Sequence, residues 1–184
     1  MWVSRGWFSY RRWRADFLSR SMEFQTLLVT YGSVVWGETV RLRETVLRTP
    51  LGLAFSKDEL ARESAQLHLA LYTGATLAGV VVLVPPPAND VRAWKLRQMA
   101  VAPAFRGKGG GAALVATAER EMRARGAAQV MLHARETAVP FYARHGYRAD
   151  DEAFEEVTIK HRRMWKELVA APTAIGSETP PTLI

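Results

Sequence analysis

The sequence contains no cysteine, and this absence narrows its chemistry. Without cysteine the chain can form no disulfide bond, no thiolate metal site and no cysteine nucleophile. It also lacks an apolar run of the roughly 20 residues that a membrane-spanning helix needs. Its first residues show no apolar core followed by a small-residue cleavage site. We therefore expect a protein without a transmembrane span, in a reducing, cytoplasmic setting.

Positive charge is the strongest bias of the composition. The 184-residue chain has a formal net charge of +7, and residues 1–21 supply +4 of it through five arginines and one aspartate. The same stretch holds three of the six tryptophans. Such an arm can lie on an anionic membrane surface, or it can be an extension that precedes the main domain. Because the rest of the chain is nearly balanced in charge, we expect no specific nucleic-acid partner.

The order of predicted elements indicates an α+β protein with one domain. Predicted strands cover residues 24–31, 67–72, 77–84, 92–101 and 128–134, and predicted helices cover about 33–48, 56–63, 109–125 and 137–146. Residues 154–166 are expected to form a last strand or one arm of a hairpin. We expect the domain to span 22–168 and residues 169–184, rich in Ala, Pro and Thr, to form a flexible tail.

Local signals predict where several helices begin and end. Ser33 is placed to cap the first helix, and Ser56 with Glu59 forms the S-x-x-E capping-box pattern. Gly126 is a suitable residue to end the third helix. Within that helix apolar residues recur every fourth position, at Leu114, Ala118 and Met122, which predicts one buried face.

A glycine-rich loop, "RGKGGG" at 106–111, lies between a predicted strand and the third helix. The first N–H groups of a helix have no partners within the helix, and the helix dipole adds partial positive charge there. Glycine lets the backbone approach a phosphate closely, and Arg106 and Lys108 add charge. The loop therefore predicts a phosphate or pyrophosphate ligand. The alternative is a tight, solvent-exposed turn.

The loop alone fits two cofactor patterns. Gly107, Gly109 and Ala112 satisfy the dinucleotide pattern G-x-G-x-x-[GA], but Pro103 follows the preceding strand and the next strand ends at His133 without an acid. The Walker pattern is not satisfied. The same loop also fits R-x-x-G-x-[GA], from Arg106 through Gly109 to Gly111. We reject the nicotinamide interpretation.

The stretch "LRQMAVAPAFRGKGGGAALV", followed by "ARETAVPFYARHGY", resembles the acetyl-coenzyme A core of the GNAT N-acetyltransferase superfamily. The resemblance is strongest over residues 96–147. The "HAR" at 133–135, together with the later "FEE" at 154–156 and His161, resembles the ElaA-like branch of small-molecule acetyltransferases. This implies a GNAT acyl-CoA N-acyltransferase fold: three α/β/α layers, with a mixed, mostly antiparallel sheet of six or seven strands and about four helices.

The resemblance also implies roles for individual residues. The backbone of Met99 and Val101 is expected to contact the pantetheine arm of acetyl-coenzyme A, with the Val101 N–H polarising the thioester carbonyl. Tyr142 is expected to be the general acid that protonates the departing thiolate. From periodicity alone Tyr142 is a core aromatic residue beside Phe141. The expected pyrophosphate cradle consists of Arg106, Gly107, Lys108, Gly109, Gly110, Gly111 and Ala112.

Three questions stay open at the level of sequence. Many family members have Asn where this chain has Arg135, so the contact usually given to that Asn is in doubt. The candidates for a general base are His133, Glu155, Glu156 and His161. Arg43 and Arg48 lie about one turn apart and either hold a substrate carboxylate or form a solvated basic face.

The function implied by the resemblance is an acetyl-CoA-dependent N-acetyltransferase. We expect a primary amine of a small molecule to attack the thioester directly in a ternary complex, because the sequence offers no activated nucleophile. No metal is implied, and a homodimer is possible. The alternative from another class is a coenzyme-A-binding regulatory or sensor module without turnover.

Overall fold

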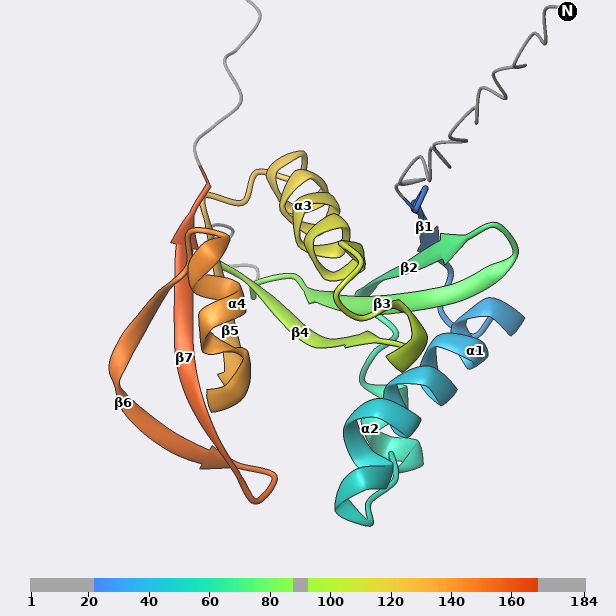
Figure 1. The fold of residues 1–184 in the computed structure, drawn as a ribbon, viewed down its shortest axis with the longest axis horizontal. Helices are drawn as coiled ribbons and strands as arrows, with labels where there is room; N and C mark the ends of the chain where they lie inside the picture. Colours follow the sequence, from blue (N-terminus) through green and yellow to red (C-terminus); the bar gives the residue numbers. More distant parts are fainter. Residues whose placement is uncertain (1–21, 88–92, 169–184) are drawn as a thin grey trace, which may run out of the picture.

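The protein folds around one seven-stranded sheet (Figure 1). The computed structural model describes residues 22–87 and 93–168. The strands are β1 (Gln25–Val29), β2 (Leu67–Thr73), β3 (Thr76–Val84), β4 (Ala93–Val101), β5 (Gln129–Arg135), β6 (Arg148–Glu156) and β7 (Ile159–Glu167). The α-helices are α1 (Val34–Arg43), α2 (Lys57–Ala61), α3 (Gly110–Arg123) and α4 (Val139–Arg144). Shorter turns are η1 (Glu44–Arg48), η2 (Thr49–Leu51), η3 (Pro103–Phe105) and η4 (Glu136–Ala138).

The sheet has the strand order β1-β2-β3-β4-β5-β7-β6. All neighbouring strands are antiparallel except β4 and β5, which are parallel. The predicted mixed, mostly antiparallel sheet and the α+β class are therefore confirmed. The connection from β4 to β5 passes through α3, as a parallel crossover requires.

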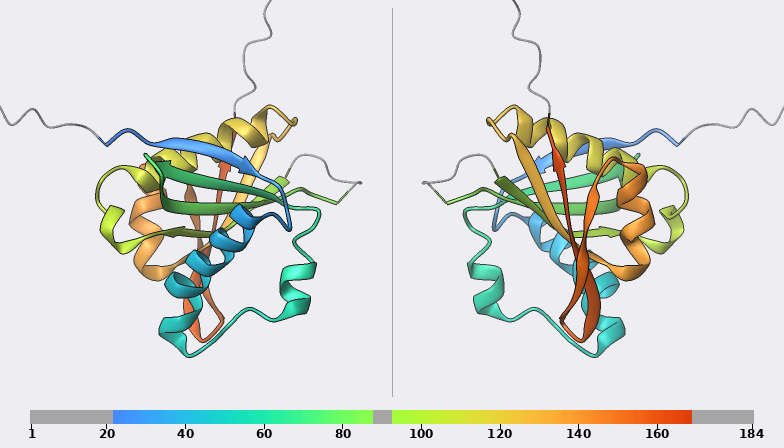
Figure 2. Two further views of the ribbon diagram at one scale, coloured as in Figure 1. Left: turned by 90° about the vertical axis from the view of Figure 1, so that its right-hand side faces the viewer. Right: turned by 90° about the vertical axis from the view of Figure 1, so that its left-hand side faces the viewer.

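Helices cover both faces of the sheet. Figure 2 shows α3 on one side of β2, β3 and β4 and α1 on the other. The predicted apolar stripe of α3 is confirmed, since Leu114, Ala118 and Met122 are fully buried against the sheet. Two aromatic residues of α4, Phe141 and Tyr142, belong to the same hydrophobic cluster as α3. This shared packing fixes α4 beside the beginning of α3.

The predicted helix caps are present. The Ser33 side chain accepts from the N–H of Trp36 at 3.1 Å. Ser56 and Glu59 form a reciprocal capping box at the start of α2, with both hydrogen bonds made. The first helix differs from expectation at its end, because after Arg43 it continues as a π-helix, η1, to Arg48. Such π-segments are uncommon and frequent at functional sites.

The last predicted strand is wrong in one respect: residues 154–166 belong to two strands, β6 and β7, joined by a two-residue turn at Val157 and Thr158. Both turn residues have positive φ, of 53° and 60°. Hairpin turns of this kind normally use Asn or Gly, so Val-Thr gave no turn signal. After Arg148, the first half of β6 consists of Ala, Asp and Glu, which are depleted in strands but suit an exposed edge.

The centre of the sheet is interrupted between β4 and β5. Their parallel pairing extends only from Ala93 with Gln129 to Leu96 with Leu132, and beyond it the two strands separate. β5 instead pairs along its whole length with β7. The sheet therefore opens a wedge between the carboxyl-terminal halves of β4 and β5.

A β-bulge in β4 lies beside this wedge. The register of β3 with β4 shifts between Val80 and Val82, so Gln98 and Met99 share one partner position on β3. Gln98 has a φ of 48°, which is rare for a residue other than glycine. A bulge re-aims the side chains that follow it, and Met99 packs against the hydrophobic cluster of α3 and α4.

Candidate active site

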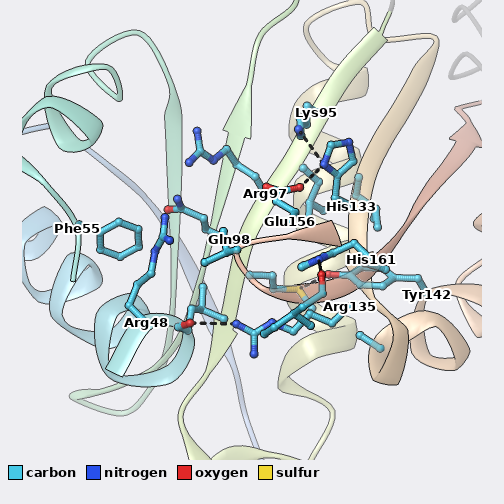
Figure 3. A pocket seen from close by; sticks show the side chains of 18 residues that line it. Arg48, Phe55, Lys95, Arg97, Gln98, His133, Arg135, Tyr142, Glu156 and His161 are labelled. Carbon is cyan, nitrogen blue, oxygen red and sulfur yellow. Dashed lines mark hydrogen bonds and ion pairs between the residues drawn. The ribbon is translucent and has the colours of Figure 1, made fainter. Parts of the chain in front are cut away.

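A cleft of about 320 Å³ occupies the wedge between β4 and β5 (Figure 3). Its walls come from β4, β5, η1, α4 and the β6–β7 hairpin. The polar and aromatic residues that line it are Arg48, Phe55, Lys95, Arg97, Gln98, His133, Arg135, Tyr142, Glu156 and His161. The cleft thus collects Tyr142, Met99, Arg48, Arg135 and three of the four candidate bases from separate parts of the chain.

Tyr142 reaches the cleft from α4. Its hydroxyl lies 4.0 Å from the sulfur of Met99, and the residue is 7% exposed. Burial raises the pKa of the Tyr142 phenol far above its ordinary value. A thioether is a weak acceptor, so the hydrogen bond to Met99 is weak and the phenol stays neutral. The hydroxyl is therefore an available proton donor at the floor of the cleft.

The backbone of Val101 faces the wedge. The N–H of Ala102 donates to the carbonyl of Ala78 at 2.9 Å, and hydrogen bonds in an antiparallel pair involve every second residue. Alternation turns the N–H of Ala100 toward β3 and that of Val101 away from it. Because pairing with β5 has already ended at Leu96, the Val101 N–H points into the open wedge.

The glycine-rich loop leads directly into α3, as predicted. Gly107 and Gly109 have φ values of 71° and 89°, a conformation that favours glycine. Gly109 is the N-terminal cap of α3, and within the described chain no side chain caps the helix. The first intrahelical bond is donated by Ala113 to the carbonyl of Gly109. The N–H groups of Gly110, Gly111 and Ala112 are thus left for an external acceptor.

The two glycines that open α3 also have a packing role. A Cβ built on Gly110 lies 3.1 Å from the Leu71 side chain, and one built on Gly111 lies 3.2 Å from the Phe141 ring. Both distances are tight for a side chain. The absence of side chains lets the start of α3 approach β2 and α4, which sets the loop next to the cleft.

The cations of the loop are placed differently from one another. The Arg106 Nε donates to the Val101 carbonyl at 3.1 Å, which ties the loop to the end of β4. Lys108 is exposed and lies 6.0 Å from the centre of the Phe105 ring. Arg106 therefore has a structural contact, whereas Lys108 remains accessible to an anion.

Arg135, the residue at the usual Asn position, has a partner on another element. Its Nη2 donates to the Leu47 carbonyl at 3.0 Å and so joins the end of β5 to η1. The π-helical turn leaves this carbonyl accessible. The guanidinium thereby forms part of the wall of the cleft opposite α4 (Figure 3).

Three of the four candidate bases line the cleft, and Glu155 does not. The Nδ1 of His133 lies 2.6 Å from a carboxylate oxygen of Glu156 and 3.4 Å from the Lys95 amine. Burial acts to raise the pKa of Glu156, but the hydrogen bond and charge of His133, together with Lys95, outweigh it and lower that pKa. Burial lowers the pKa of Lys95. His133, Glu156 and Lys95 thus form a compact group of titratable side chains on one wall of the cleft.

His161 is the second imidazole of the cleft. The Nδ1 of His161 lies 2.8 Å from the carbonyl of Ile159, so in the neutral ring this nitrogen carries the hydrogen and Nε2 holds the lone pair. The residue is 9% exposed. It is one of the residues that line the cleft (Figure 3).

A buried ion pair beneath the bulge was missed at the level of sequence. Arg43, which we considered as a substrate ligand or a solvated residue, is neither, because it is fully buried and pairs with both oxygens of Glu63 at 2.6 and 2.8 Å. The same guanidinium donates to the side chain of Gln98 in the bulge. Helical spacing indicated on which side of the helix Arg43 lies, but it did not indicate that the residue is buried. Arg48, the other arginine of that pair, does line the cleft.

A parallel strand pair that parts beside a bulge, followed by a glycine-rich start of a helix, defines the acyl-CoA N-acyltransferase fold. Residues 49–168 match the model of the acetyltransferase (GNAT) domain, so the chain belongs to this family of N-acetyltransferases. It is 26% identical over 135 residues to a Bacillus subtilis (strain 168) protein named uncharacterized N-acetyltransferase YitI, covering 71% of this chain and 91% of that protein.

Solved structures give the same fold. ElaA of Escherichia coli superposes with a TM-score of 0.64 at 21% identity, over 79% of this chain and 99% of ElaA. An aminoglycoside 6'-N-acetyltransferase, solved with coenzyme A, gives 0.65 at 14% identity, over 81% and 99%. The predicted GNAT fold is confirmed, and ElaA is among the structural neighbours.

Among the helices of residues 22–87 and 93–168, none is long and apolar enough to cross a membrane. The cytoplasmic setting and a homodimer stay predictions, as do the domain bounds. The predicted extension at 1–21 and tail at 169–184 lie outside the described residues.

Proposed function

We propose that the protein is an acetyl-CoA-dependent N-acetyltransferase that transfers the acetyl group to a primary amine of a small molecule. The observation that carries the proposal is the wedge between β4 and β5, with the Tyr142 hydroxyl inside it and the N-terminus of α3 beside it. Family membership supports the reaction type. The small-molecule acceptor is supported by the structural neighbour that acetylates aminoglycosides.

The residues present fit coenzyme A. The N–H groups of Gly110, Gly111 and Ala112 at the α3 dipole suit a pyrophosphate, with Lys108 as an accessible cation. The open edge of β4 offers backbone groups to an extended amide-bearing arm, at Met99 and Val101. Acetyl-coenzyme A, when bound, supplies an activated acetyl thioester.

Two groups of this chain act on the reacting atoms in the proposed mechanism. The Val101 N–H, which points into the wedge, donates a hydrogen bond to the carbonyl oxygen as negative charge develops there. The Tyr142 hydroxyl gives its proton to the departing sulfur. Burial keeps Tyr142 protonated throughout the neutral range, since it raises the pKa of the phenol.

The ammonium of the acceptor must lose a proton before it attacks, and an imidazole of the cleft accepts it in this proposal. His133 and His161 each have one nitrogen engaged, by Glu156 and by the Ile159 carbonyl respectively. Within the described residues the second nitrogen of each ring has no hydrogen-bond partner, which leaves it for the substrate. Because the acyl group passes directly to the amine, no side-chain nucleophile is required.

The first test is binding and turnover of acetyl-coenzyme A. A ligand that binds only the native state raises the melting temperature, and a hundredfold excess over Kd adds about 2.7 kcal/mol of stability. We expect such a rise at millimolar acetyl-coenzyme A, and release of free thiol when amines are supplied. An unchanged melting temperature would refute coenzyme A binding. A rise without thiol release from any amine would favour the regulatory or sensor module.

A further inference from the structure

We infer that the acceptor carries an anionic oxygen group, a carboxylate or a phosphate, in addition to its amine, and that Arg135 and Arg48 bind this group. The inference rests on the proposed function, because it concerns the substrate class of the same cleft. It depends on the balance of charge in the cleft and on how each cation is neutralised.

Cations outnumber acids among the residues that line the cleft. Arg48, Lys95, Arg97 and Arg135 contribute positive charge, and Glu156 is the one carboxylate among the described lining residues. On β4 and β5 these cations alternate with buried apolar residues such as Leu96 and Ala134. Lys95, Arg97 and Arg135 therefore share one face of the sheet, the face opposite to the hydrophobic cluster.

Only some of these cations have a carboxylate partner. Glu156 binds His133 and lies near Lys95. Arg48 pairs with Glu59 at 2.9 Å. Arg135 binds a neutral carbonyl, that of Leu47, and in the described chain neither Arg135 nor Arg97 forms an ion pair.

The carboxylate of Glu63, whose charge acts most strongly on Arg97, is already neutralised. The charge of Glu63 acts on Arg97, but both carboxylate oxygens of Glu63 bind Arg43. The cleft therefore has a surplus of positive charge that is not balanced by neighbouring side chains.

This surplus is costly unless an anion joins it. Arg97 and Arg135 are both partly buried, and burial is the main factor that lowers the pKa of each guanidinium. The positive charge of Arg48 acts in the same direction on Arg135, and both arginines line the cleft. Removing unpaired charges from water is unfavourable, and perturbed groups of this kind concentrate at binding sites.

The two arginines are held in place to receive a ligand. Arg48 ends η1, and its guanidinium lies 4.7 Å from the centre of the Phe55 ring. Arg135 ends β5 and is fixed by the Leu47 carbonyl. They enter the cleft from different walls (Figure 3). A guanidinium offers paired N–H donors that match carboxylate and phosphate oxygens. Arg135, which has no carboxylate partner in the described chain, and Arg48, which shares its charge with Glu59, are therefore placed to bind an anion rather than a polycation.

The test compares matched amines that differ in charge. The twenty amino acids are compared with their amides, phosphoethanolamine with ethanolamine, and spermidine serves as a polycation. Thiol release gives kcat and KM, and the melting temperature without acetyl-coenzyme A gives binding alone. We expect at least one carboxylate or phosphate amine to exceed its matched neutral amine by roughly tenfold or more in kcat/KM, and to raise the melting temperature where the neutral amine does not. A preference for the carboxylate amines or for the phosphate amine shows which of the two anionic groups the acceptor carries.

Variants assign the effect to the arginines. Arg135→Gln is expected to raise KM for the preferred anionic amine by roughly 10- to 100-fold, more than it lowers kcat, and to leave KM for the neutral partner nearly unchanged. Arg135→Lys, which keeps the charge, should recover part of the loss. Arg125→Gln, which removes an exposed arginine of the α3 end paired with Glu121, is the control and should change neither.

The inference is overturned if neutral amines or spermidine are used as well as the anionic ones, or if Arg135→Gln weakens both members of a pair equally. It is also overturned if acetyl-coenzyme A raises the melting temperature but no anionic amine does so or releases thiol. Failure of the proposed function is a different result, in which acetyl-coenzyme A itself neither binds nor reacts.

Discussion

Among single residues, Tyr142 lies at the boundary between the hydrophobic cluster and the cleft. The ring belongs to the hydrophobic cluster, and the hydroxyl touches Met99 at the wedge. The core-aromatic interpretation of the sequence is therefore confirmed, and the same residue also lines the cleft, while its role as general acid stays a prediction. Tyrosine suits such a boundary because one end is apolar and the other can donate.

Removing that hydroxyl tests its role. Tyr142→Phe is expected to lower kcat by about 10²-fold, because the leaving sulfur loses its proton donor, with little change in affinity for acetyl-coenzyme A. Steady-state kinetics and titration calorimetry measure the two quantities. Tyr147→Phe is the matched control: its ring lies 5.7 Å from Tyr142, it is 3% exposed, and it does not line the cleft. Full activity in Tyr142→Phe would remove the tyrosine from the mechanism.

His68 makes the stability of the fold depend on pH. It is fully buried in β2, and burial lowers its pKa, partly opposed by the charge of Glu63. The unfolded chain therefore binds a proton below about pH 6.5 that the folded chain binds less readily. Stability is present above this pH and is lost as pH falls toward the lowered pKa, by up to about 1.4 kcal/mol per pH unit.

Urea unfolding at about pH 7.5 and pH 5.5 measures this loss. His68→Gln should lose less stability between the two values than the original protein, whatever its stability at the higher pH. Equal losses in both would mean that other groups cause the acid sensitivity.

At the scale of elements, the beginning of α3 combines an unusual backbone conformation with the proposed pyrophosphate site. Gly109 caps the helix with a φ of 89°, and Gly126 follows its end with a φ of 84°. Each is in a conformation that costs other residues about 1–2 kcal/mol. The two positions are alike in local conformation but lie at opposite ends of one helix, and only the first faces the proposed pyrophosphate.

This symmetry gives a matched pair of variants. Gly109→Ala and Gly126→Ala are each expected to lower the free energy of unfolding by about 1–2 kcal/mol. Only Gly109→Ala should also weaken acetyl-coenzyme A binding, because strain at the cap displaces the free N–H groups of α3. Denaturant unfolding and calorimetry separate the two effects. Equal affinity in both variants would argue against the loop as the phosphate site.

How far the elements could be predicted depended on local signals. Strands β2 and β3, the capping box and the stripe of α3 were all predicted, because strand composition, cap residues and apolar spacing act over a few residues. The turn between β6 and β7 was missed, because Val157 and Thr158 are not turn-forming residues. The burial of Arg43 could not be predicted, because its partner Glu63 lies on another segment.

At the scale of the whole molecule, the described site residues all lie between Met22 and Leu168. The arm at 1–21, with its charge of +4, contributes to the overall charge of the chain. The wedge, the bulge and the α3 start are formed by later residues. We therefore predict that the proposed reaction proceeds without the arm.

Deletion of residues 2–21 tests this statement. We expect the shortened protein to keep its acetyl-coenzyme A-induced rise in melting temperature and its thiol-release activity within about twofold, because every residue proposed to bind or react is retained. Anionic lipid vesicles, offered to both forms, test the membrane-surface interpretation of the arm. If activity vanished while cofactor binding survived, the arm would belong to the functional site.

The short pairing of β4 with β5 gives the sheet a mechanical seam. Strands β1 to β4 form one plate and β5 to β7 another, and four residue pairs at one end hold the plates together through hydrogen bonds. A force that separates the open ends of β4 and β5 is therefore resisted, in the sheet itself, by these four residue pairs. A molecule bound in the wedge would contact both β4 and β5 at the end where the two strands are not paired. The proposed reactant would then also stabilise the sheet against separation of its two halves.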